Sequence, residues 1–383
     1  MEDMRDVIQP LSLVEPDFSS SLTDLIIELD YLRRNETRGT TPPWIFFQLK
    51  EIFHLLESIG SARIEGNNTT VAEYIETKIE NQREDYPQPI REIMNMEETM
   101  DFIEEAVQHN PIDRAFISQL HMNVVSRLEF PPYGEGDRTP GKYRKSNIRI
   151  HQSAHTPPDF MQVEQLMNEL IRFINENHSS KYDLLKIAIT HHRFVWIHPF
   201  SNGNGRTVRL LTYAMLIKAG FITNNQRLIN PTAVFCHNRN HYYENLAQAD
   251  TGERVGMLVW CEYVLKGLRE EIRKIDSLAD YTFLKNEVLL PMLVYSYDRK
   301  YITSKELSIL RVVVEKKIIQ AADIKHLFEG KSDSEISRQI RNLIQKKMIM
   351  PIEDKSRKYH LRFHENYLLR GIMHALGRLG FLP

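Results

Sequence analysis

Apolar residues recur every three or four positions along most of this chain, which is the spacing of helices that bury one face. The segment before residue 40 is irregular and then helical, and residues 35–43, rich in Thr and Pro, resemble a linker. The chain is therefore expected to be mainly α-helical. Helices are predicted at about 44–59, 70–82, 88–108, 112–127, 160–177, 182–197, 206–219, 238–250 and 254–278.

The pattern changes after Thr303. Two predicted helices are followed by a third, which begins at Ser332 in a sequence that resembles a capping box and runs through Lys346. Alternating positions then predict strands at 348–351 and 358–363, on either side of a charged turn. This order of elements predicts a winged-helix (α+β) domain at residues 281–383.

Composition bounds the class of protein. With 383 residues, of which 42% are hydrophobic, the chain can form two or three domains. A net charge of -2 argues against a dominant nucleic-acid or membrane-surface role. No apolar stretch has the length of a membrane span and the first residues do not begin a signal peptide, so a cytoplasmic location is expected. Cys236 and Cys261 are predicted to be buried, reduced thiols.

The predicted winged helix is locally basic. Residues 301–363 contain 14 Lys plus Arg against 8 Asp plus Glu, an excess of 6 positive charges. Basic residues on or after its third helix and at the charged turn could meet DNA phosphates, but such domains also dock proteins. DNA binding is therefore an alternative that is not favoured. These basic residues are Arg338, Arg341, Lys346, Lys347, Lys355, Arg357 and Lys358.

The most informative segment is 198–209, which reads His-Pro-Phe-Ser-Asn-Gly-Asn-Gly-Arg-Thr-Val-Arg. Pro199 and the Asn-Gly-Asn-Gly run at 202–205 predict an irregular turn, and the apolar residues that follow predict a buried helix. The turn thus lies at a helix N-terminus, where free amides and the helix dipole favour an anion.

Side chains around this turn suit phosphate chemistry. Arg206 and Arg209 are three positions apart, so they share a helix face and can present their guanidinium groups to neighbouring phosphates. His198 can accept a proton from an attacking hydroxyl at neutral pH. The combination predicts phosphoryl or nucleotidyl transfer.

These twelve residues resemble the signature of the Fic family, His-Pro-Phe-x-(Asp or Glu)-Gly-Asn-(Gly or Lys)-Arg-x-x-Arg, at eleven of twelve positions. The resemblance extends over about residues 45–260. It implies a Fic-type helical bundle with a short β-hairpin flap. An N-terminal helical region is then expected at 1–105 and a catalytic core at 106–280.

The resemblance implies transfer of AMP from ATP to a Ser, Thr or Tyr hydroxyl of a protein, with Mg²⁺ bridging the phosphates. His198 would be the general base, and Phe200 would anchor the loop in the core. The nucleotide would be bound by Gly203, Asn204 and Gly205 in an anion hole, by Arg206 at the β-phosphate and by Arg209 at the γ-phosphate.

Position 202 departs from the family pattern. The family has Asp or Glu there as the direct ligand of the metal, whereas this chain has Asn202. An amide oxygen can coordinate Mg²⁺ but has no charge, so metal affinity should fall. Asn202→Asp is therefore predicted to strengthen Mg²⁺-dependent transfer.

A second motif, at 61–66, resembles the Fic inhibitory signature (Ser or Thr)-x-x-x-Glu-(Gly or Asn). Ser61 and Glu65 are four positions apart and share a helical face, and Gly66 is suited to end that helix. In the family this Glu pairs with the second arginine of the signature, here Arg209, and competes with the γ-phosphate. Whether Glu65 also supports removal of AMP is left open.

Two further regions are candidates for ligand contact. Residues 146–151 alternate polar and apolar positions, and Asn147, Ile148, Arg149 and Ile150 are predicted to form the flap that pairs with the target. Tyr242 and Tyr243 are candidates for stacking on adenine, although adjacent helical residues point to different faces and one of the two is expected in the core.

The sequence therefore leaves two classes of function open. One is an autoinhibited adenylyltransferase whose target is another protein or the chain itself. Related chains with an N-terminal inhibitory helix often form homodimers, so a homodimer is a further expectation. The other is a DNA-binding regulator whose Fic core senses nucleotide with weak or no transfer activity. Intact His198, Arg206 and Arg209 favour the first class.

Overall fold

The computed structural model describes residues 10–34, 39–80, 86–150, 155–221, 231–236, 238–330 and 332–382. The described residues divide into two compact units, one within 1–36, 57–68 and 87–272 and the other within 37–56, 69–86 and 273–383. The units draw on interleaved stretches of chain because helix α2 (Pro43–Ile64) contributes to both. The sequence predicted consecutive segments instead.

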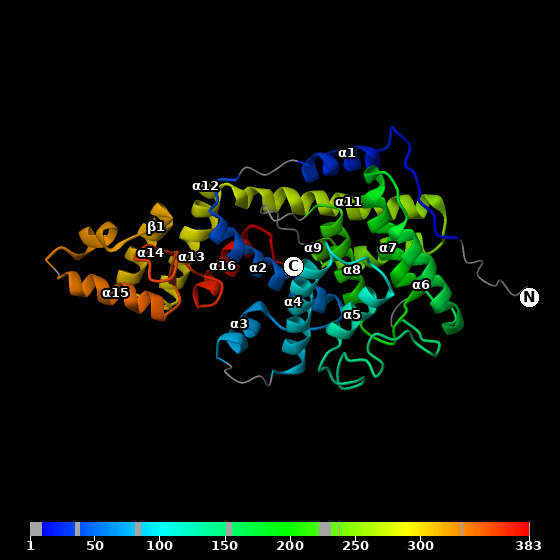
Figure 1. Cartoon of the computed structure of the whole chain (residues 1–383), viewed down its shortest axis with the longest axis horizontal. Helices are drawn as coiled ribbons and strands as arrows, with labels where there is room; N and C mark the ends of the chain where they lie inside the picture. The colour runs from blue at the N-terminus through cyan, green and yellow to red at the C-terminus, as the bar shows by residue number, and fades with distance from the viewer. Residues whose placement is uncertain are drawn as a thin grey trace, which may run out of the picture. The chain divides into compact units, whose positions relative to one another are not determined.

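The first unit is a helical bundle built around α8 (Asn204–Lys218). Nearly every residue of α8 is buried, so the helix is surrounded on all sides. It packs against α4, α5 and α7, as Figure 1 shows. The other elements of this unit are α1 (Ser21–Arg34), α4 (Gln88–Ala106), α5 (Arg114–Val124), α6 (Phe160–Asn175), η1 (Ser180–Tyr182), α7 (Asp183–Ile197), α9 (Pro231–Cys236), α10 (Arg239–Ala249) and most of α11 (Arg254–Asp276).

The second unit combines helices with a small antiparallel sheet of order β1-β3-β2, in which Ile349 pairs with Leu361. Its helices pack mainly through α13 and α16. Its elements are α3 (Val71–Glu80), η2 (Ser277–Ala279), α12 (Tyr281–Phe283), η3 (Leu284–Leu289), α13 (Leu290–Asp298), α14 (Ser304–Lys316), β1 (Ile318–Ile319), η4 (Ala321–Phe328), α15 (Asp333–Gln345), β2 (Ile349–Pro351), β3 (Tyr359–Leu361) and α16 (Leu368–Arg378).

The structure confirms the mainly α prediction, with 66% helix and one three-stranded sheet near the C-terminus. The two strands predicted around the charged turn correspond to β2 and β3, whereas β1 was not predicted. Among the described residues, no helix combines the length and the apolar character needed to cross a membrane.

One local prediction, the capping box at Ser332, is wrong, and another, the flap hairpin, falls partly outside the described residues. Residues 147–150 alternate in exposure but form no strand, and residues 151–154, which would complete the predicted flap hairpin, lie outside the described residues. The capping box predicted at Ser332 is not formed, because Glu335 binds Arg338 and Gln339 instead. A capping box is present at Thr303 and Glu306, at the start of α14.

Candidate active site

The loop between α7 and α8 has an unusual backbone at both ends. His198 ends α7 in the left-handed region, with φ 51° and ψ 62°, which is uncommon for a residue with a side chain. Gly203 precedes α8 with φ 72°, a conformation that glycine adopts without steric cost. Such backbone persists where the surroundings hold it in place.

Asn204 closes this loop through its side chain. Its Oδ1 accepts from the Phe200 amide over 2.9 Å, and its Nδ2 donates to the Phe200 carbonyl over 2.9 Å. Phe200 itself is fully buried. The predicted role of Phe200 as an anchor in the core agrees with this burial.

His121 supports the same loop from α5, and sequence reasoning missed it. The Gly141 amide donates to His121 Nδ1 over 2.8 Å, so the proton lies on Nε2, which donates to the Asn202 carbonyl over 3.0 Å. The imidazole also stacks on Phe200, with ring centroids 3.8 Å apart. Burial lowers the pKa of His121 to about 4, so this neutral tautomer persists at pH 7.

His198 is held with one nitrogen ready to accept a proton. Its Nδ1 lies 3.2 Å from the Val195 carbonyl, which can only accept, so Nδ1 carries the proton and Nε2 has a free lone pair. Burial lowers the pKa of His198 to about 4. The imidazole is therefore neutral at pH 7, as a general base must be.

The start of α8 is covered by a carboxylate from the segment after α2. Arg209 donates to Glu65 Oε1 over 2.6 Å, and it also donates to the hydroxyl of Ser61 over 2.7 Å and to the Ser61 carbonyl over 3.0 Å. A methyl group added at Gly205 would collide with the Glu65 carboxylate. The carboxylate thus lies against the first turn of α8, where an anion is favoured.

Charge keeps Glu65 ionised in this position. Burial opposes ionisation of the carboxyl group, but Arg209 overrides it, with smaller contributions from Arg206 and His198, and the pKa of Glu65 lies below its ordinary value. Directly after Glu65 the backbone changes direction at Gly66, which has φ 104°. The pair Glu65–Arg209 therefore persists throughout the neutral pH range.

Arg206, the other predicted phosphate ligand, is also paired. Its Nη1 lies 2.9 Å from Glu92 Oε1, and both side chains are almost completely buried. Glu92 in turn accepts from Asn67 Nδ2 over 2.7 Å, and Asn67 directly follows the 61–66 motif. Glu92 was not identified from the sequence.

The predicted metal position, Asn202, lies among acidic side chains. Its amide Oδ1 accepts from the Gly203 amide over 2.8 Å, and its Nδ2 donates to Glu135 Oε2 over 3.2 Å. Amide and carboxylate oxygens are hard donors that fit Mg²⁺. Within the described residues, no group of three or more His, Cys, Asp or Glu side chains could hold a metal by itself.

The remaining predicted residues are more scattered. Tyr242 is 2% exposed and its hydroxyl lies 2.9 Å from His191 Nε2, so it belongs to the core and gives adenine no surface on which to stack. For Tyr243, which is 41% exposed, adenine contact stays a prediction.

Asn147, from the predicted flap, binds the start of α6: its side-chain oxygen accepts from the Phe160 amide over 2.9 Å. Cys236 is half-buried and Cys261 is buried, both as free thiols.

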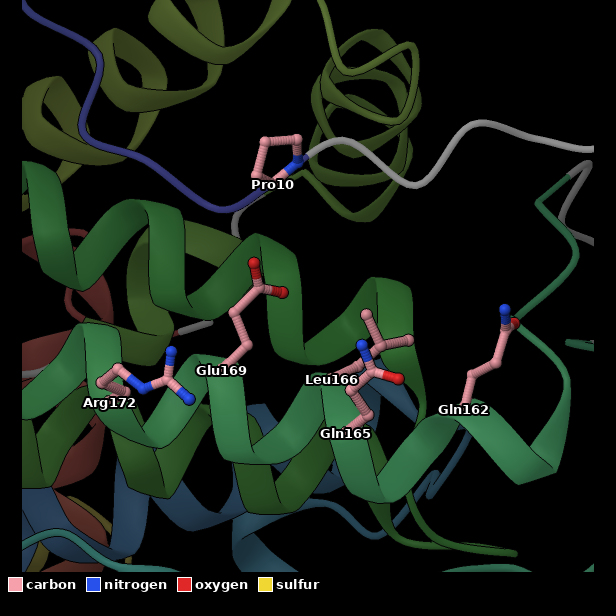
Figure 2. Close-up of a pocket in the computed structure, with 6 residues that line it drawn as sticks. All are labelled: Pro10, Gln162, Gln165, Leu166, Glu169 and Arg172. Carbon is pink, nitrogen blue, oxygen red and sulfur yellow. The ribbon is translucent and has the colours of Figure 1, made fainter.

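A surface cavity of about 350 Å³ lies elsewhere in the first unit. Figure 2 shows its polar side chains projecting from α6 beneath Pro10. It contains none of the residues of the two motifs, so it is separate from the His198 site. Its lining is Pro10, Gln162, Gln165, Leu166, Glu169 and Arg172.

Comparison with known proteins agrees with this fold. Residues 111–216 match the Fic/DOC family, so the chain contains a Fic/DOC domain. It is distantly related to Fic protein adenylyltransferases: 31% identical over 205 residues to the one of Drosophila yakuba and 30% to that of Drosophila melanogaster. Each match covers 52% of this chain and 37% of the relative, so this chain matches well under half the length of those proteins.

Solved structures share the fold at low sequence identity. A Fic family protein from Desulfovibrio desulfuricans aligns with a TM-score of 0.54 and 19% identity, over 92% of this chain and 98% of that one. Residues 134–508 of Fic-1 from C. elegans align with a TM-score of 0.53 and 19% identity, over 66% of this chain and 71% of that one.

Proposed function

We propose that the chain is an autoinhibited protein adenylyltransferase, which transfers AMP from ATP to a Ser, Thr or Tyr hydroxyl of a protein. The observation on which this proposal depends is the Glu65 carboxylate, held by Arg209 against Gly205. An ionised carboxylate at this helix N-terminus is a stand-in for a phosphate. A site that attracts an internal anion so strongly supports binding of a triphosphate once that anion leaves.

His198 gives the site its chemical step. The acceptor hydroxyl attacks the α-phosphorus, its proton passes to Nε2 of His198, and the bond to the β-phosphate breaks to release pyrophosphate. The neutral tautomer with Nε2 unprotonated supports this role. Arg206 and Arg209 would hold the leaving phosphates, so the rate enhancement comes mainly from positioning and electrostatics.

Mg²⁺ would neutralise charge between the phosphates, and the Asn202 side chain is the protein group predicted to meet it. In the unaltered chain, Glu65 would restrain transfer. Because Glu65 and the γ-phosphate need the same guanidinium group of Arg209, ATP can bind productively only when the carboxylate is displaced.

The test uses ATP labelled at the α-phosphate, with Mg²⁺ and the full-length protein. Glu65→Gly, and the matched Glu65→Gln, which keeps the shape and removes the charge, should raise label on protein at least about tenfold, the effect of about 1.4 kcal/mol. Adding His198→Ala to either variant should abolish the label while sparing ATP binding. Equal labelling of wild type and both Glu65 variants would contradict autoinhibition, and labelling without His198 would contradict the mechanism.

A further inference from the structure

Asn202 has no carboxylate of its own, but the carboxylate of Glu135 lies beside its side chain. Asn202 Nδ2 donates to Glu135 Oε2 over 3.2 Å and to the Gly136 carbonyl over 3.3 Å. Glu135 belongs to the loop between α5 and α6, 67 residues before Asn202 in the chain. The contact therefore depends on the tertiary fold.

Glu135 is also next to Arg206. Arg206 Nη2 donates to the Glu135 carbonyl over 3.0 Å and lies 3.4 Å from its Oε2. The side chain of Glu135 is 47% exposed, whereas that of Arg206 is 1% exposed. The carboxylate thus lies at the edge of the site, between solvent, the amide of Asn202 and a predicted phosphate ligand.

A second acid, Asp137, is already committed to the loop backbone. It is 3% exposed and accepts from the Asn202 amide over 3.2 Å and from the Thr139 amide over 2.7 Å. These bonds fix the turn that presents Asn202. Glu135, with its exposed side chain, is the acid that can turn toward an entering cation.

We propose that Glu135 supplies the charged oxygen ligand for Mg²⁺ that Asn202 cannot supply, with the Asn202 amide oxygen as a neutral partner ligand. Mg²⁺ prefers oxygen ligands and is bound through one or two carboxylates together with substrate phosphates. Moving the charge from position 202 to position 135 keeps one carboxylate in the site. This inference rests on the proposed nucleotidyl transfer, because the phosphates of ATP complete the coordination.

The test measures metal dependence of ATP binding and needs no turnover. The dissociation constant of ATP is measured by calorimetry with excess Mg²⁺ and with EDTA, in full-length protein that carries Glu65→Gly. Glu135→Gln should reduce the ratio of the dissociation constant in EDTA to the dissociation constant in Mg²⁺ about tenfold or more. Glu129→Gln, at an exposed glutamate of the same loop, is the matched control and should leave the ratio unchanged.

Relocating the carboxylate gives a sharper test. Asn202→Asp should restore the ratio in the Glu135→Gln background, and the same change should have a smaller effect where Glu135 is intact, because the two side chains serve one ion. An unchanged ratio in Glu135→Gln would overturn the proposal. So would tighter ATP binding with both Mg²⁺ and EDTA, since Glu135 would then be masking Arg206.

These outcomes are separable from those of the proposed function. If ATP binds with a metal dependence that follows Glu135 but no AMP is transferred, the metal ligand is supported and the transferase is not. If AMP is transferred with a metal dependence indifferent to Glu135, the transferase is supported and the metal ligand is not.

Discussion

Each of the two arginines of the motif is buried against a carboxylate. The side chains of Arg206 and Arg209 are both 1% exposed, and they lie 2.9 Å from Glu92 and 2.6 Å from Glu65. The two pairs differ in what surrounds them, since Glu92 is 5% exposed and Glu65 is 28% exposed at the side chain. Glu65 can therefore leave its arginine more readily than Glu92 can.

Removal of Glu92 should cost stability. Glu92→Ala removes the buried carboxylate nearest to the guanidinium of Arg206 and leaves this arginine with the partly exposed Glu135, so we expect the free energy of unfolding to fall by about 3–5 kcal/mol. Urea unfolding measures this change. Glu98→Ala, at an exposed position of the same helix, should cost about 0.5 kcal/mol or less. Equal losses in the two variants would show that the Glu92–Arg206 pair is not stabilising.

The pH dependence of transfer should follow the buried state of His198. The pKa of this imidazole is lowered to about 4, so the proton-accepting form is present above that pH and is lost as the pH falls through it. In the Glu65→Gly variant, kcat/KM should therefore stay level well below 6.5, the ordinary value for His. A midpoint near 6.5 would mean that His198 is solvated in the free enzyme. Circular dichroism at each pH controls for acid unfolding.

The active loop is organised as one element by side chains that bind its backbone. Asn204 binds both the amide and the carbonyl of Phe200, and His121 holds the Asn202 carbonyl. These bonds fix the direction of the amides that begin α8. The loop is therefore preorganised by its own side chains and by α5.

Loss of the Asn204 side chain should loosen this element. Asn204→Ala removes two buried hydrogen bonds and should lower the free energy of unfolding by about 1–3 kcal/mol. ATP binding in the Glu65→Gly background should weaken as well, although the backbone amide is retained. Asn204→Asp keeps the acceptor for the Phe200 amide, so its free energy of unfolding should lie between those of the parent and of Asn204→Ala. ATP binding by Asn204→Ala as tight as by the parent would contradict preorganisation.

Helices and motifs were predictable because their signals are local. The period of apolar residues located α6, α7 and α10 to within a few residues, and the sequence 198–209 identified the loop before α8. His121, Glu92 and Glu135 were not predictable, because each contacts a residue of the site that is at least 67 positions away in the chain. Tyr242 illustrates the same limit, because only the packing around His191 decides which of two adjacent tyrosines is buried.

The cap of α15 was predicted wrongly and the strand β1 was missed, each for a local reason. Ser332 starts α15 without a side-chain cap because its hydroxyl is hydrogen-bonded to that of Ser334, and Glu335 is engaged by Arg338. At the start of α14, in contrast, Thr303 and Glu306 form a capping box. The strand β1 has two residues, Ile318 and Ile319, which is too short for an alternating pattern. Its pairing with β3 supplies the hydrogen bonds that define it.

At the scale of the whole molecule, part of the basic surface predicted near the C-terminus is paired with neighbouring acids. Arg338 lies 2.9 Å from Glu335, and Lys346 lies 2.6 Å from Glu306. Such pairs reduce the positive field that would attract DNA. DNA binding therefore stays the less favoured of the two predictions.

We expect DNA binding to be weak and independent of sequence. Fluorescence anisotropy with labelled duplexes should give dissociation constants of about 10⁻⁴–10⁻⁶ M at physiological salt, and these should rise steeply with salt. Arg338→Ala should have less effect than Arg357→Ala, because Arg338 is already paired. A constant near 10⁻⁸ M for one sequence and not for others would contradict this prediction.

The glutamate that covers the start of α8 is tethered to the arginine it blocks, 144 residues away along the same chain. A tethered competitor has a fixed effective concentration, so dilution of the protein does not weaken it, whereas ATP competes through its free concentration. In the proposed enzyme, the output per molecule would therefore follow the ATP supply and would be indifferent to how much of the protein is present.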